Sequence, residues 1–196
     1  MRFRAGRFVR AAAILGGLLG ASCASGPSGV VEPSGVDLMH APRVYTLVNL
    51  HPDEVRARLY AVNYQQAGLI PRCSQVDLIE INRESLRLRV SASGREYHYY
   101  YHDSASEPFD QHLLKYFGSS CNPGDVLSLS DTDQAGIREG KASPGMTRQG
   151  VIYAIGYPPP HITPDLDAAQ WTYWKSRFDR MIVVFDEGGR VVAIRD

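Results

Sequence analysis

The chain has no excess of charge of either sign. Its 196 residues include 21 lysines and arginines and 21 aspartates and glutamates, so the formal net charge is zero. A protein that binds nucleic acid normally presents a strongly basic face. The balance therefore argues against nucleic acid as a partner, while the 44% hydrophobic content is that of a globular protein.

Short motifs of common catalytic sites are also missing. The sequence contains no Gly-rich phosphate loop, no Gly-x-Ser-x-Gly nucleophile elbow, no His-Glu-x-x-His and no Cys-x-x-Cys pairs. The best metal candidates are His98, His102, Asp103 and His112. Positions 98 and 102 of one strand lie roughly 13 Å apart, too far to share one zinc ion. These side chains are interpreted as structural or solvent-facing, and neither a metal, a cofactor nor a small-molecule substrate is expected.

No hydrophobic run is long enough to span a bilayer. The N-terminal residues 1–10 carry four arginines, and residues 11–22 are uncharged and mostly apolar. The run ends in Leu-Leu-Gly-Ala-Ser-Cys at residues 18–23, which resembles a bacterial lipobox. That resemblance implies a signal peptide over residues 1–22 and lipidation of Cys23. An ordinary secretory signal cut near Cys23 is the alternative.

The residues after Cys23 bear on where the chain would reside. Residue 24 is Ala rather than the Asp that often retains lipoproteins in the inner membrane. An outer-membrane location is therefore expected, lipid-anchored and facing the periplasm or the cell surface. Residues 23–41 are rich in Gly, Pro and Ser and are expected to form a flexible tether.

Cysteine is scarce, with three in the chain. If Cys23 carries lipid, Cys73 and Cys121 remain as an even pair in an oxidising compartment. A disulfide between them would close a loop of about 50 residues and contribute about 3–4 kcal/mol. Free thiols are the alternative. A catalytic cysteine is disfavoured because neither residue begins a helix, where a thiol pKa is lowered.

Residues 42–125 are expected to form a small antiparallel, barrel-like sheet. Strand patterns recur at residues 43–49, 76–81, 86–90 and 97–102. Residues 51–64 fit a short helix start or a further strand. Apolar residues at helical spacing predict a helix over residues 109–117, with Gly118 as its C-cap. Residues 126–129 are a last strand of this domain or a link into the next.

Two helices and a three-stranded meander are predicted for residues 126–196. Ser130 has capping-box-like spacing for the first helix, and Thr147 is a plausible N-cap for the second. The second helix ends at Gly156, before consecutive prolines that forbid its continuation. Strands follow at residues 171–174, 181–185 and 191–194, the last two joined by a Glu-Gly-Gly turn.

This order of signals resembles the SmpA/OmlA domain, the fold of a small lipoprotein subunit of the outer-membrane β-barrel assembly machinery. The shared pieces are, in order, Gly145-Met146-Thr147, Gly156-x-Pro158, Trp171-x-Tyr173, Val183-x-Phe185, and an ending with Gly189, Val191 and Ile194. The resemblance implies an α+β fold for residues 126–196 and a role in envelope assembly. Residues 30–125 have no counterpart in the minimal family member.

Aromatic residues near the meander suggest a binding surface. Trp171 and Tyr173 share one face of a strand and are expected to pack as core, which leaves Trp174 on the other face. An exposed aromatic patch beside a rigid loop is typical of a protein contact. The predicted partner-binding residues are Trp174, Tyr157, Pro158, Pro159, Pro160 and His161.

Taken together, these signals predict a non-catalytic outer-membrane lipoprotein that acts as a protein-binding accessory in envelope assembly or maintenance. Its partners would be envelope or outer-membrane proteins, and its membrane contact the lipid anchor. One alternative is a periplasmic enzyme inhibitor, since the helix–helix–meander order resembles the repeat of β-lactamase inhibitor proteins. The other is a zinc- or cysteine-dependent cell-wall enzyme.

Overall fold

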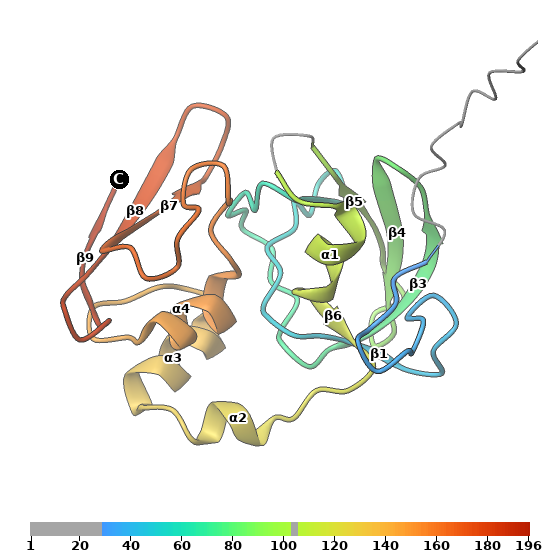
Figure 1. Cartoon of the computed structure of the whole chain (residues 1–196), viewed down its shortest axis with the longest axis horizontal. Coiled ribbons are helices and arrows are strands. Elements are labelled where there is room, and N and C mark those ends of the chain that lie inside the picture. The colour runs from blue at the N-terminus through green and yellow to red at the C-terminus, as the bar shows by residue number, and fades with distance from the viewer. Residues whose placement is uncertain (1–28, 103–105) are drawn as a thin grey trace, which may run out of the picture.

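The computed structural model describes residues 29–102 and 106–196, so the predicted lipidation site Cys23 and the candidate ligand Asp103 lie outside the described residues. The chain is an α+β protein with two sheets (Figure 1). One is a curled half-barrel formed within residues 44–118. The other is a three-stranded meander near the C-terminus, accompanied by short helices.

The half-barrel is a six-stranded sheet in the order β2-β5-β4-β3-β1-β6. Its strands are β1 (Val44–Thr46), β2 (Arg58–Tyr60), β3 (Gln75–Ile81), β4 (Ser85–Val90), β5 (Glu96–Tyr100) and β6 (Phe117–Gly118). The predicted sheet was purely antiparallel, and this is wrong in one place, because β2 runs parallel to β5. Alternation along a strand tells which side chains share a face, but not which strand lies beside it.

Helix α1 (Phe109–Leu114) lies in the hollow of the curled sheet (Figure 1). It is shorter than predicted, because its C-cap is Lys115 and not Gly118. Phe117 is fully buried, and the Phe117–Gly118 segment pairs with β1 as the sixth strand. Burial of the Phe117 ring is thus achieved with this segment as a strand and not as a continuation of α1.

The predicted flexible tether does not extend through residues 29–41. Val30 and Leu38 are 0% and 1% exposed, and the Leu38 amide donates to the Val30 carbonyl over 2.8 Å. Glu32 accepts hydrogen bonds from the backbone amide and hydroxyl of Ser119, over 2.9 and 2.7 Å. Buried apolar residues within a Gly- and Pro-rich stretch therefore attach it to the half-barrel.

Three helices connect the sheets. Residues 126–129, predicted as a strand or a link, do not form a strand; Val126 and Leu127 belong to the short helix α2 (Gly124–Leu127). Helices α3 (Asp131–Glu139) and α4 (Arg148–Ile155) begin at the predicted caps: the Ser130 side chain accepts from the Asp133 amide and the Thr147 side chain from the Gly150 amide. Both predicted N-caps are confirmed.

A buried carboxylate joins α3 to α4. Asp133 is 0% exposed and accepts from the Ser130 hydroxyl over 2.7 Å and from the Thr147 amide over 2.7 Å. A Cβ atom on Gly150 would lie 1.9 Å from an Asp133 oxygen. The two helices therefore approach at a place where only glycine fits.

The meander consists of β7 (Gln170–Trp174), β8 (Arg180–Phe185) and β9 (Val191–Arg195), paired antiparallel in that order. Gly189, with φ of 73°, makes the turn into β9. The predicted core face is confirmed: Trp171 and Tyr173 are each 0% exposed, and the Tyr173 hydroxyl donates to the Gly156 carbonyl.

The two sheets are joined by buried contacts. One hydrophobic cluster includes residues of both. The Asn49 amide donates to the carbonyls of Ile137 and Ala154, over 2.7 and 3.1 Å. Tyr64 forms a parallel bridge with Trp174 at the edge of β7. The domain division at residues 125 and 126 stays a prediction, and α2 spans it.

Within the described ranges, none of the helices is long and apolar enough to cross a membrane.

Candidate functional site

The most promising site is a cavity of about 470 Å³ where the half-barrel meets the meander. Its size is within the range of about 300–1,000 Å³ found for ligand sites. It is called the aromatic pocket below. Its lining residues are Arg58, Tyr60, Val62, Tyr64, Tyr100, Tyr101, His102, His161, Trp174 and Arg177.

The outer face of the half-barrel supplies one wall. Along β5 the side chains alternate, with Tyr97 and Tyr99 buried in the core and Tyr100 half-buried on the other face. Tyr60 of β2 is paired with Tyr100, and their rings stack with centroids 6.0 Å apart. The Tyr64 ring meets Tyr60 edge-on at 5.1 Å. Three tyrosines thus form a continuous ladder of rings on this face.

A tight turn after β2 directs the ladder toward the meander. Asn63 adopts φ of 52° and donates to the carbonyls of Ile155 and Tyr157, over 2.8 and 2.7 Å. The next residues run along β7, where the Gln65 amide donates to the Trp174 carbonyl over 2.8 Å. Backbone pairing therefore holds Tyr64 beside Trp174.

Two arginines give the aromatic pocket a positive charge. The Arg58 guanidinium lies 5.4 Å from the centre of the Tyr100 ring, and Arg177 is exposed on the turn after β7. Neither side chain forms an ion pair within residues 29–102 and 106–196. A third cation, Arg180, lies over the Trp174 ring at 4.5 Å. Stacking on Tyr100 and Trp174 keeps the guanidiniums of Arg58 and Arg180 next to lining residues of the cavity while leaving their N–H groups available.

Two histidines complete the lining. Both are exposed, and His161 comes from the proline-rich loop while His102 follows β5. Partial burial, together with repulsion from His102, lowers the pKa of His161. The pocket therefore presents a predominantly neutral His161 at neutral pH.

The predicted binding residues are divided by the fold. Trp174 and His161 line the aromatic pocket together. Tyr157 belongs to a different cavity, where Tyr116 meets its ring edge-on at 5.9 Å. Pro158 and Pro159 are buried and Pro160 is half-buried, so the expected exposed proline surface is not present. Thr163, which follows the proline loop, accepts a hydrogen bond from the Thr172 amide of β7 over 3.0 Å and attaches the loop to the meander.

The histidines of residues 98–112 do not converge on one point. His98 is on the outer face of β5, whereas His112 is 2% exposed in the interior. His112 is hydrogen-bonded to the Tyr99 hydroxyl over 2.7 Å and to Glu107 over 2.9 Å. Burial lowers the pKa of His112. In the described part of the chain there is no group of three or more His, Cys, Asp or Glu placed to hold a metal ion.

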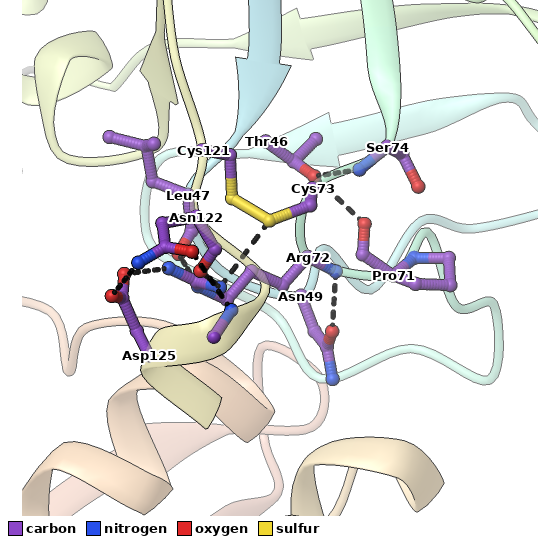
Figure 2. The surroundings of a disulfide bond; sticks show 11 residues. Thr46, Leu47, Asn49, Pro71, Arg72, Cys73, Ser74, Cys121, Asn122 and Asp125 are labelled. Carbon is purple, nitrogen blue, oxygen red and sulfur yellow. Dashed lines mark hydrogen bonds and ion pairs between the residues drawn. A yellow bond between two sulfur atoms is a disulfide. The ribbon is translucent and has the colours of Figure 1, made fainter. Parts of the chain in front are cut away.

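Cys73 and Cys121 form a disulfide, with Cα atoms 5.4 Å apart (Figure 2), which is the pairing that the cysteine count predicts. Arg72 lies beside it with a side chain only 7% exposed. Its guanidinium donates to the carbonyl of Asn122 and to the carboxylate of Asp125, over 3.0 and 2.9 Å. Disulfide and arginine together hold the segment that leads into α2 against the half-barrel.

Sequence reasoning missed most of the aromatic pocket. The sequence patterns predict a strand at Tyr100 and leave Tyr60 and Tyr64 open between strand and helix. They assign no binding role to Arg58 or Arg177. The available signal was the number of tyrosines, 11 in the chain, several of them near strand ends. The number of tyrosines does not indicate which strands are neighbours. The pocket depends on β2 lying next to β5 and on Tyr64 lying next to Trp174.

Comparisons with protein-family models, with curated proteins and with solved structures find no significant match to this chain.

Proposed function

We propose that this protein is a non-catalytic accessory of the bacterial cell envelope, anchored by lipid at Cys23, that captures a partner protein in the aromatic pocket. The pocket is the observation that carries the proposal. Its lining is dominated by tyrosine, tryptophan and arginine. These are the residue types that supply most of the binding energy at protein interfaces.

Three further features support an envelope role. The N-terminal sequence resembles a lipoprotein signal, and the Cys73–Cys121 disulfide is of the kind that persists in an oxidising compartment. Residues 131–195 form two helices followed by a three-stranded meander, which is the order that the resemblance of the sequence motifs to the SmpA/OmlA domain implies. An accessory protein of this kind needs a stable scaffold and one adhesive face, and no reacting groups.

The anchor is tested by making the full-length chain and its Cys23→Ala variant in a Gram-negative host. We expect a lipid-sized mass increase and membrane fractionation for the first chain, and neither for the variant. A soluble, unmodified wild-type product would refute the anchor and favour the periplasmic inhibitor or the cell-wall enzyme.

The binding face is tested in the same cells with a photo-crosslinking amino acid. Phe178 is 87% exposed and its ring lies 5.2 Å from the guanidinium of the lining residue Arg177, so it places the probe beside the pocket. Leu127 of α2, 73% exposed, is the control position. We expect an adduct with an envelope protein from position 178 that disappears with Trp174→Ala. Equal adducts from both positions, or none from either, would refute capture at the pocket.

A further inference from the structure

The aromatic pocket is unusual in its charge. Two of its lining residues are arginines without an ion-pair partner among the described residues, and the lining contains no aspartate or glutamate from those residues. Arg180 adds a third cation next to Trp174. The whole chain is electrically neutral. The positive charge is therefore a local property of this pocket, and it complements an anionic ligand.

The hydrogen-bonding groups of the pocket further restrict the chemical class of ligand that it can bind. Arginine and the tryptophan indole only donate, and the lining has no carboxylate or carboxamide side chain in the described residues. Tyrosine hydroxyls and histidine nitrogens are the remaining polar groups. A neutral saccharide, whose many hydroxyl protons need acceptors, finds few here. A ligand rich in carbonyl and carboxylate oxygens is a better match.

The spacing of the rings points to a particular backbone. Tyr60 lies between Tyr64 and Tyr100, with ring centroids 5.1 and 6.0 Å away. Trp174, whose backbone bridges to Tyr64, lines the same cavity. Grooves between neighbouring aromatic rings are the usual receptors for polyproline II segments. Such a segment advances about 3.1 Å per residue, makes no internal hydrogen bonds, and exposes its carbonyls to donors at about every third position.

We propose that the aromatic pocket binds an extended, proline-containing acidic segment of the partner protein. Its proline rings lie against Tyr60, Tyr64 and Trp174, and its carboxylates pair with Arg58 and Arg177. A proline contributes a flat apolar ring and an acceptor carbonyl but no amide donor. This matches a lining of rings and donors. The inference deepens the proposed function, since it names the chemistry of the partner.

The test measures binding of synthetic peptides to the purified full-length chain. The probe is acetyl-Pro-Pro-Glu-Pro-Pro-Glu-Pro-amide. One matched peptide replaces both glutamates by glutamine, and another replaces the prolines by alanine. Trp174 lies at the site, so its fluorescence reports binding, and calorimetry provides an independent measurement.

We expect the glutamate peptide to bind about tenfold more tightly than the glutamine peptide, and to weaken as salt rises from about 50 mM to about 500 mM. The alanine peptide should also be weaker, because it is not preorganised as a polyproline II helix. The double variant Arg58→Gln/Arg177→Gln should bind the glutamate and glutamine peptides equally. Arg89→Gln is the control, since Arg89 lies on β4 and pairs with Glu96.

Equal binding of the glutamate and glutamine peptides by the unaltered chain would overturn the proposal, and so would failure of both to bind. Binding of a carboxylate-bearing disaccharide in place of the peptides would assign the pocket to a glycan. Crosslinking at Phe178 separates this failure from failure of the proposed function. If the adduct forms in cells while the peptides do not bind, partner capture stands and the ligand class is wrong.

Discussion

The inner and outer faces of this protein's strands carry the same aromatic residue types in contrasting settings. On β7, Trp171 is 0% exposed in the core, whereas Trp174 lines the pocket on the opposite face. On β5, Tyr99 is fully buried and Tyr100 is half-buried in the pocket wall. The inner rings are surrounded by protein and stabilise the fold. The outer rings are only partly covered, so part of their surface remains available to bind a partner.

The largest expected effect comes from the two tryptophans of β7. Trp171→Ala removes a fully buried ring that meets Phe185 edge-on at 4.6 Å, and we expect it to lower the free energy of unfolding by about 3–5 kcal/mol. Trp174→Ala should cost about 1 kcal/mol or less. Urea unfolding of both variants measures the difference. Similar losses for the two would mean that Trp174 belongs to the core, which would remove it from the binding face.

The tyrosines of β5 give the next largest effect. Tyr99→Phe deletes a buried hydroxyl bonded to His112 over 2.7 Å and leaves a ring nitrogen without its partner, so we expect a loss of about 1–3 kcal/mol. Tyr100→Phe is the matched control on the outer face, with an expected change of about 0.5 kcal/mol at most. Denaturation midpoints of the two variants measure the difference. A larger loss of stability in Tyr100→Phe than in Tyr99→Phe would contradict the assignment of Tyr99 to the core and Tyr100 to the outer face.

Buried histidines should also make the free energy of unfolding depend on pH. Burial holds the pKa of His112 below its ordinary value of 6.5, and burial acts on His51 in the same direction. As the pH falls through about 6.5, the unfolded chain takes up protons before the folded chain does, so stability is lost, at up to about 1.4 kcal/mol per pH unit for each group. Unfolding measured from about pH 7.5 to about pH 5.5 should show this decline.

His112→Gln should make that decline shallower, because it removes a buried imidazole whose pKa burial lowers. The slope is the quantity to compare, since His112→Gln also lowers stability at every pH by removing the hydrogen bonds to Tyr99 and Glu107. An unchanged slope in His112→Gln would assign the dependence to other groups.

The smallest expected effect is a difference in fluorescence quenching between the two tryptophans, measured in variants that each retain one of them. Trp171→Phe leaves Trp174 as the only tryptophan, and Trp174→Phe leaves Trp171. Acrylamide should quench Trp174 strongly and Trp171 weakly, because only the ring at the pocket is in contact with solvent. Addition of the proline–glutamate peptide should protect Trp174 alone. Protection of Trp171 would indicate a global change and not occupancy of the pocket.

Local sequence rules predicted much of the fold. The side chains of Ser130 and Thr147 cap the helices where their spacing indicates, and Gly156 ends α4. Alternation of apolar and polar residues located β3 and β4 within one residue at either end. Where these rules failed, a contact between residues distant in sequence decided the structure. Phe117 was predicted in a helix but pairs with β1. Val30 and Leu38 were predicted in a flexible tether but are buried in the core.

The candidate site was predicted less well, because its residues come from separate parts of the chain. Trp174 and His161 were predicted and do line the pocket, but Pro158 and Pro159 are buried. A prolyl ring is as suited to a core as to a surface, and the sequence contains no sign of which applies. The wall formed by Tyr60 and Tyr100 depends on a parallel pairing between strands that lie 40 residues apart in sequence.

By itself, the sequence determined the properties that depend on near neighbours: the N-caps of α3 and α4, the inward and outward faces of β4 and β7, the neutral charge, and a pair of cysteines for one disulfide. Tertiary structure alone decided that β2 lies beside β5, that Tyr64 lies beside Trp174, and that Arg58 and Arg177 face one cavity. The physical reason is that helix caps and strand alternation act over a few residues, whereas a pocket forms where burial brings distant segments together.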